Sequence, residues 1–162
     1  MVETDLLIFI RILVITVLAG FLGWEREAAG KAAGLRTHIL VGISAVLFVV
    51  LGEFMILKYQ NFSQLVRFDL AGLVGAVVTG ISFLGAGMIV FRKGENSVKG
   101  LTTAAGVLTT AAIGMLVGLE RYVLAIGTTL IVFVVLRFLN IFEMRFLQSE
   151  GESSDSGDAS DG

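Results

Sequence analysis

The densest cluster of charge near the apolar runs of this chain is one segment, residues 23–37, which reads GWEREAAGKAAGLRT. Its acids and bases are Glu25, Arg26, Glu27, Lys31 and Arg36. Such side chains can form ion pairs with one another, contact lipid headgroups or bind a charged partner. Long apolar runs flank the segment on both sides. It therefore lies at a membrane surface or lines a protected polar site.

Residue types also limit the chemistry that this chain can perform. Because it has no cysteine, disulfides, thiolate metal sites and cysteine nucleophiles are excluded. The single histidine, His38, makes no zinc site on its own, and a structural, hydrogen-bonded ring is its simplest interpretation. No nucleophile and base stand at a recognisable catalytic spacing. We expect a non-enzymatic protein without a cofactor, and the sequence leaves any metal ion unidentified.

Composition places the chain among integral membrane proteins. Its 162 residues are 56% hydrophobic and 16% charged, with a mean hydropathy of +0.90. The formal net charge of -2 gives no reason to expect nucleic-acid binding, which uses strongly basic surfaces. The length is enough for one domain.

Five apolar runs approach the roughly 20 residues that a helix needs to cross a bilayer. They lack the alternation of a barrel wall. We therefore expect an all-α integral membrane protein, a bundle of five transmembrane helices within residues 1–147. Residues 148–162 form an acidic Ser/Gly tail that we expect to be disordered. The approximate bounds of the helices are 5–24, 35–57, 70–91, 101–119 and 122–140.

Lysine and arginine are distributed unevenly between the two sides of this bundle. With the N-terminus outside, eight of these residues face the cytoplasm and three face outwards. Cytoplasmic loops carry the excess of basic residues in membrane proteins. We expect an outer N-terminus, a cytoplasmic C-terminus and a multi-pass protein of the cell inner (cytoplasmic) membrane.

Small residues recur at four-residue intervals in the helix predicted at 101–119, and comparable rows occur at 70–91. Helices in lipid associate through close backbone approach over small residues. We therefore expect these two helices to form the tight centre of the bundle, although a row of glycine and threonine could instead line a narrow polar path. The row of the fourth helix consists of Thr102, Gly106, Thr110, Gly114 and Gly118.

Two ion pairs are predicted from the depths of the charged residues. Arg11 and Glu53 lie at similar outer depth in antiparallel neighbours, and a lone charge there costs at least about 2.5 to 3.5 kcal/mol. We predict that they face each other; separate snorkelling to the headgroups is the alternative. At the inner end, we predict that Glu25 pairs with Arg36. Arg26 and Lys31 would then be available to headgroups or to a partner.

Three blocks of the sequence carry a family resemblance. They read GWEREAAGKAAGLRTHILVG, GISFLGAGMI, and VKGLTTAAG followed by AAIGMLVG. In this order they resemble the signature blocks of the MgtC/SapB family of bacterial and archaeal membrane proteins, in a short SapB-like form without the family's soluble C-terminal domain. Departures occur at Gly72, Ala76, Ser82 and Leu108. The resemblance marks as candidate functional residues Glu25, Arg26, Gly34, Arg36, Thr37, Gly85, Gly87, Asn96, Gly100 and Thr103.

This resemblance implies a regulatory function. MgtC-type proteins are associated with adaptation to low magnesium and with virulence, through binding of the membrane ATP synthase. The resemblance implies a partner of that kind, another membrane protein complex met within the lipid bilayer. A cation (magnesium) channel or transporter is the alternative. One protomer offers few carboxylates at membrane depth for such a role, and a homo-oligomer would multiply them.

Overall fold

The computed structural model describes residues 2–59, 69–92 and 97–155. The described part is mainly helical, as the sequence predicts. A two-stranded antiparallel hairpin, β1 (Val90–Arg92) and β2 (Ser97–Lys99), stands between the third and fourth helices, with Val90 opposite Lys99. The five helices are α1 Val2–Ala28, α2 Leu35–Tyr59, α3 Leu70–Met88, α4 Leu101–Gly118 and α5 Tyr122–Asp155.

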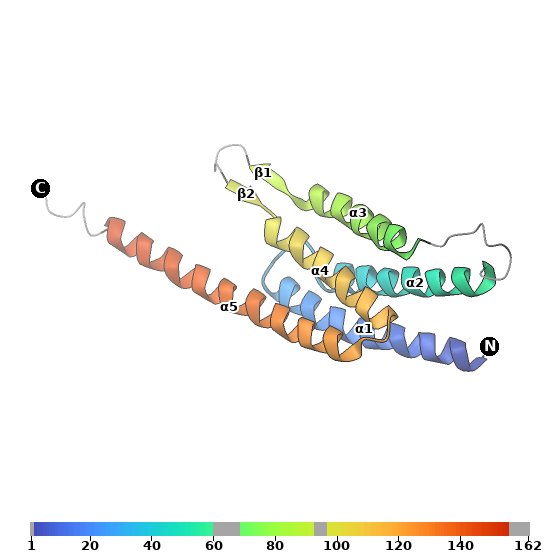
Figure 1. The fold of residues 1–162 in the computed structure, drawn as a ribbon. Helices are drawn as coiled ribbons and strands as arrows, with labels where there is room; N and C mark the ends of the chain where they lie inside the picture. Colours follow the sequence, from blue (N-terminus) through green and yellow to red (C-terminus); the bar gives the residue numbers. More distant parts are fainter. Residues whose placement is uncertain (1, 60–68, 93–96, 156–162) are drawn as a thin grey trace, which may run out of the picture.

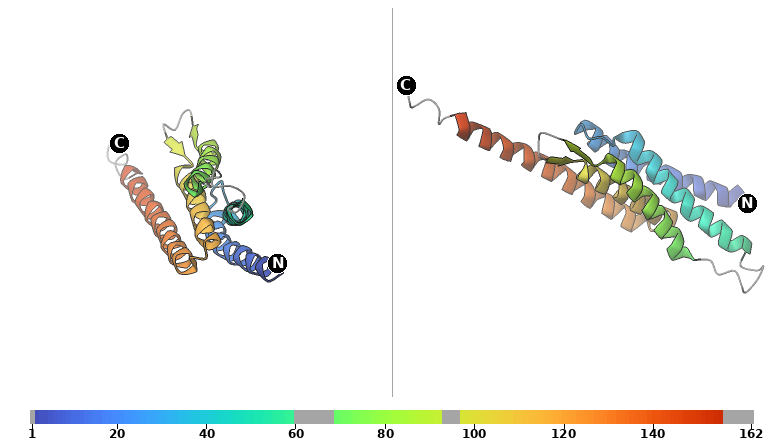
Figure 2. Two further views of the ribbon diagram at one scale, coloured as in Figure 1. Left: turned by 45° about the vertical axis from the view of Figure 1, so that its right-hand side comes forward. Right: turned by 90° about the horizontal axis from the view of Figure 1, so that it is seen from above.

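The helices surround α4, which packs against every other helix of the bundle. The first two helices lie side by side and antiparallel, and α4 runs along both of them (Figure 1). Helix α3 lies mainly against α4, on the outer side of the bundle. The right-hand view in Figure 2 shows α5 extending well past the ends of its neighbours. The hydrophobic core, where α1, α2, α4 and α5 meet, comprises Ile15, Ala19, Leu22, Val46, Val50, Ile113, Val117 and Ala125.

Close backbone approach joins α4 to α2. A Cβ atom added at Gly114 would lie 2.6 Å from the carbonyl oxygen of Gly42, and one added at Gly118 would lie 2.8 Å from the Cβ of Val49. Both distances are shorter than real side chains tolerate, so these positions require glycine. The small-residue row of α4 is therefore a packing face.

The hydroxyl groups on this face support the same interpretation. Thr110 is fully buried, and its hydroxyl donates a 2.9 Å hydrogen bond to the carbonyl oxygen of Gly106 in its own helix. The buried face begins with Thr103, whereas Thr102, which the sequence places in the row, is exposed. In this structure the hydroxyl of Thr110 therefore bonds within its own helix, so it needs no polar path beside the helix as a partner.

The prediction that the third and fourth helices form the tight centre is wrong. Helix α4 is central, but its closest approach is to α2, and α3 is peripheral. Gly75, Gly80 and Gly87 of α3 have no atom within 4 Å of the place where a Cβ would lie. Small residues permit close approach, but they do not specify which helix will use it.

Two predicted boundaries also change. Helix α3 ends at Met88, because the β-branched and aromatic residues that follow pair as β1 instead of continuing the helix to residue 91. Helix α5 continues to Asp155, although the sequence predicts an end near residue 140 and disorder from residue 148. Residues 141–150 contain neither proline nor glycine, so nothing in their backbone interrupts the helix. Residues 156–162 lie outside the described part.

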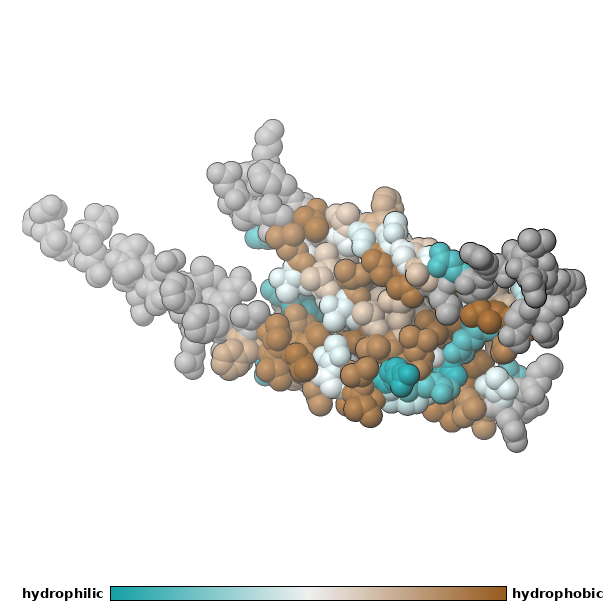
Figure 3. Space-filling view, in the orientation of Figure 1, coloured by the Kyte–Doolittle hydropathy of each residue, from teal (hydrophilic) through white to brown (hydrophobic). Residues whose placement is uncertain are grey.

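Within the described residues, four helices are long and apolar enough to cross a membrane: Thr4–Ala28, Leu35–Tyr59, Ala71–Met88 and Leu101–Gly118. Tyr122–Phe138 is a shorter apolar helix. Hydrophobic residues dominate the described part of the face shown in Figure 3. Large apolar side chains are widely exposed, such as Val17 at 69% and Phe83 at 80%. Such a surface is suited to contact with lipid.

Candidate functional site

The turn between α1 and α2 places the first motif at one end of the bundle. Gly30 has a φ of 65°, a left-handed conformation that favours glycine. A carboxylate oxygen of Glu27 accepts a 2.8 Å hydrogen bond from the amide of Leu35, the first residue of α2. A Cβ atom at Gly34 would lie 2.7 Å from that same oxygen. Gly34 therefore leaves room for the Glu27 side chain that caps α2.

Glu25 and Arg26 form a buried ion pair at this end of α1. Their residues are 4% and 2% exposed, and Arg26 donates from Nε to a carboxylate oxygen of Glu25. Nη2 of Arg26 also donates to the carbonyl oxygen of Leu136 in α5, at 3.3 Å. The predicted pair of Glu25 with Arg36 is absent among the described residues, and Arg36 is exposed. The prediction of a surface role for Arg26 is therefore wrong, because its charge is neutralised inside the bundle.

His38 lies beside this ion pair and is fully buried. Its Nδ1 is 2.9 Å from the carbonyl oxygen of Gly34, one turn earlier. The ring is within electrostatic reach of both Glu25 and Arg26. Across the interface, Gly106 of α4 faces the Nε2 atom of His38. The first and third motifs thus meet at a buried polar cluster, which we define as Glu25, Arg26 and His38.

The remaining motif residues shape the backbone around this cluster. Gly100 has a φ of 98° before α4, and a Cβ there would lie 2.1 Å from the carbonyl oxygen of Met88, so only glycine is compatible. Gly85 faces Ala104 across the α3–α4 contact, where an added Cβ would lie 3.4 Å from the alanine Cβ. Thr37 is half-buried. Asn96 lies outside the described residues.

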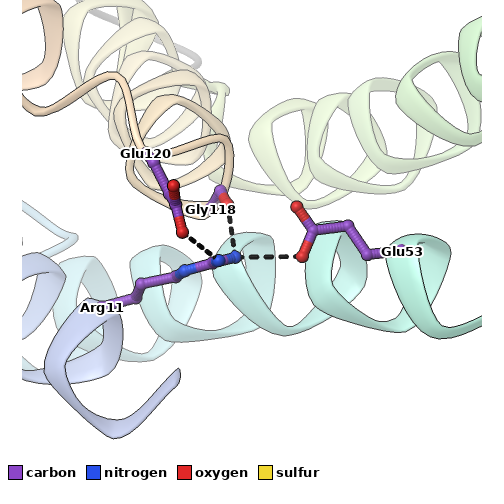
Figure 4. Close-up of polar contacts among 4 residues, drawn as sticks. All are labelled: Arg11, Glu53, Gly118 and Glu120. Atoms are coloured by element: carbon purple, nitrogen blue, oxygen red, sulfur yellow. Dashed lines mark hydrogen bonds and ion pairs between the residues drawn. The ribbon is translucent and has the colours of Figure 1, made fainter. Parts of the chain in front are cut away.

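A second polar cluster lies at the opposite end of the bundle (Figure 4). Nη1 of Arg11 is 3.0 Å from a carboxylate oxygen of Glu53, so the predicted contact is present. Nη1 also donates at 2.8 Å to the carbonyl oxygen of Gly118, and Nη2 donates to Glu120. One guanidinium therefore joins α1, α2 and the end of α4. Arg11 is 8% exposed, whereas the Glu53 and Glu120 side chains are 41% and 55% exposed.

Glu120 was not expected from the sequence. It follows the end of α4 with a φ of 60°, and the amides of Glu120 and Arg121 donate to the carbonyl oxygens of Val117 and Leu116. These two bonds form a Schellman motif, in which the left-handed position usually holds glycine. An acid at a helix C-terminus also opposes the helix dipole. Only the second of these features, an acid at the end of an apolar run, was visible in the sequence as a signal that a cation lies beside Glu120.

The fold and its two polar clusters define a multi-pass helical membrane protein. A family model described as "MgtC family" matches residues 12–145, and the chain belongs to this family. No solved structure matches the chain.

Relatives of this chain carry several names. It is 36% identical over 143 residues to "Putative magnesium transporter YhiD" of Escherichia coli (strain K12), covering 85% of this chain and 63% of that protein. It is 42% identical over 104 residues to "Protein MgtC" of Brucella abortus (strain 2308), covering 63% and 38%. "Protein SrpB" of Synechococcus elongatus is 31% identical over 150 residues, covering 88% and 80%. The chain thus spans less than two thirds of the length of the YhiD and MgtC relatives.

The buried ion pair predicts unequal effects for two arginines of the same motif. Arg26→Gln leaves the Glu25 carboxylate buried without its cation, and breaking a buried pair from one side costs about 3 to 5 kcal/mol. Arg36→Gln changes an exposed side chain and should alter stability by less than about 0.5 kcal/mol. The measurement is the free energy of unfolding of the detergent-solubilised protein. Equal, small effects of the two changes would contradict the burial of Arg26.

The Arg11 cluster predicts non-additive effects. Arg11→Gln and Glu53→Gln should each lower the free energy of unfolding. We expect the sum of these two losses to differ from the loss in the double variant by about 1 kcal/mol, which is within the range for residues in contact. A second cycle that combines Arg11→Gln with Glu27→Gln, at the opposite end of the bundle, is the control and should be additive. Additive losses in the first cycle would mean that the two charges act separately.

Proposed function

We propose that this chain is a non-enzymatic membrane protein that binds and regulates another membrane protein complex. The open glycine face of α3 is the observation that supports this proposal most. Gly80 and Gly87 lie seven residues apart on one side of α3, where they permit close backbone approach by a further helix, and no helix of the described protomer uses them. In membrane proteins, small residues are enriched at the contacts between transmembrane helices. We propose that a transmembrane helix of the partner packs here.

The groove beside α3 has the chemistry that this interaction needs. A cavity of about 630 Å³ lies between α2 and α3 and is lined almost wholly by apolar side chains, among them Leu40, Phe48 and Phe83. The exposed Ser44 contributes a hydroxyl to this lining. Apolar side chains of an incoming helix can enter the groove, and its polar groups can bond Ser44. As the family resemblance implies, we propose the membrane ATP synthase as the first partner to test.

Transport of a cation is the second candidate function. The name of the YhiD relative favours it, as do the two carboxylates near Arg11, which lie partly exposed at one end of the bundle. Against it, the Gly/Thr face of α4 is used for packing on α2. Among the described residues, no group of three or more His, Cys, Asp or Glu could hold a metal ion. We therefore rank regulation above transport.

We further propose five spans, an outer N-terminus and a location in the cell inner membrane. The two polar clusters lie at opposite ends of the bundle, as expected if each end lies near one of the two surfaces of a bilayer. The apolar part of α5 covers about 25 Å at 1.5 Å per residue, slightly less than the hydrocarbon core. Flanking residues that reach the interface can make up this difference. The excess of lysine and arginine on one side supports the orientation.

Partner binding through α3 predicts a position-specific loss of association. Gly80→Leu adds a side chain where the partner helix should approach, so we expect recovery of the membrane ATP synthase with the tagged protein to fall several-fold. Gly127→Leu makes the same chemical change at another open glycine, on α5, and should leave recovery unchanged. Equal recovery with all three proteins would reject the α3 site.

Flux measurements separate the two candidate functions. We expect liposomes that contain only the purified protein to show no Mg²⁺ flux above that of empty liposomes. A robust flux that disappears in Glu53→Gln would overturn the regulatory proposal and establish transport.

A further inference from the structure

We propose that a single water molecule binds inside the bundle, between α2 and α4, and donates a hydrogen bond to Nε2 of His38. The ring of His38 is fully buried, and no group in the described part of the chain bonds to Nε2. Buried polar atoms in folded proteins nearly always have a hydrogen-bond partner, and ordered water supplies it where the protein does not. This site is separate from the α3 face and does not depend on the proposed function.

The other ring nitrogen determines which kind of ligand Nε2 needs. Nδ1 lies 2.9 Å from the carbonyl oxygen of Gly34, which can only accept a hydrogen bond. Nδ1 must therefore carry the proton. In a neutral imidazole the Nε2 atom then presents a lone pair, so its ligand must be a hydrogen-bond donor.

The space beside Nε2 suggests the size of that donor. A Cβ atom built on Gly106 has one neighbour within 4 Å, the Nε2 atom itself at 3.7 Å. The face of α4 opposite His38 therefore has room for a group of the size of a methyl. Any larger residue at position 106 would fill it.

The surroundings can also hold a water molecule in place. Thr103 and Thr110 lie about one helical turn to either side of Gly106 and are both buried. Thr110 donates its proton to the carbonyl oxygen of Gly106, so its own oxygen can still accept a hydrogen bond. A buried water needs two to four polar partners, and Nε2 with a neighbouring threonine oxygen meets the lower number.

A metal ion is a poorer ligand for this site. A histidine whose Nδ1 is bonded to a backbone carbonyl does resemble a metal ligand. The Arg26 guanidinium is within electrostatic reach of the ring, however, and would repel a cation. The neighbouring Glu25 carboxylate is already paired with Arg26. A neutral donor such as water carries no such penalty.

The single histidine makes the test direct. In the 162-residue protein labelled with ¹⁵N in the histidine ring and reconstituted in lipid nanodiscs, the ring nitrogens of His38 give the only labelled signals. We expect a proton on Nδ1, an Nε2 resonance displaced upfield from that of an unbonded lone pair, and a correlation between the ring and slowly exchanging water.

Two variants locate the water. Gly106→Ala places a methyl group in the proposed space, so we expect the water correlation to disappear and the Nε2 resonance to move towards the unbonded position. Gly127→Ala makes the same change at an open position on α5 and should leave both signals unchanged. An unbonded Nε2 in the original protein, a proton on Nε2, or a water correlation that survives in Gly106→Ala would each overturn the proposal. If Gly106→Ala fails to fold, the signals of the original protein still decide whether Nε2 receives a hydrogen bond.

Discussion

The close packing of α4 on α2 is the constraint on which the rest of this structure depends. Lipid gives helices no hydrophobic reason to associate, so the bundle needs backbone contacts that only small residues permit. At Gly114 the approach is so close that a single methyl group would clash with the carbonyl oxygen of Gly42. Because α1 and α5 also pack on α4, the position of this one interface sets the positions of the surrounding helices.

Both polar clusters follow from the placement of α4. Its C-terminal end brings the carbonyl of Gly118 and the carboxylate of Glu120 to Arg11, which α1 would otherwise bury with fewer partners. Its N-terminal half brings Gly106 to His38, beside the ion pair of Glu25 and Arg26. The same arrangement leaves α3 at the edge of the bundle, with Gly80 and Gly87 exposed. The residues of the three sequence blocks thus include some that close the bundle, such as Gly114, and some that leave a side of α3 open, such as Gly87.

Sequence reasoning identified the helices and the contact between Arg11 and Glu53, because apolar length and charge depth are properties of each segment by itself. Of the five spans that it predicted, four are long apolar helices in the structure and the fifth is shorter. Its predictions were wrong where a helix or a charged residue had more than one possible neighbour to contact. Small residues on α3 and α4 show that each can approach a neighbour closely, but not which neighbour. Glu25 pairs with the adjacent Arg26, since both turn inwards at the end of α1. The capping role of Glu27 and the contact of Arg26 with Leu136 involve backbone atoms, for which side-chain patterns give no signal.

Accessibility of the α4 face to water tests the central claim most directly. The chain has no cysteine, so a single introduced thiol can be followed without background. The measurement is the rate of modification by a water-soluble methanethiosulfonate reagent in membranes for Thr110→Cys, with Ala32→Cys in the exposed α1–α2 turn as the reactive control. A sealed, packed face predicts rapid modification of Ala32→Cys and none of Thr110→Cys. Comparable rates would show that water runs along α4, which would contradict the packed centre and favour a conducting path.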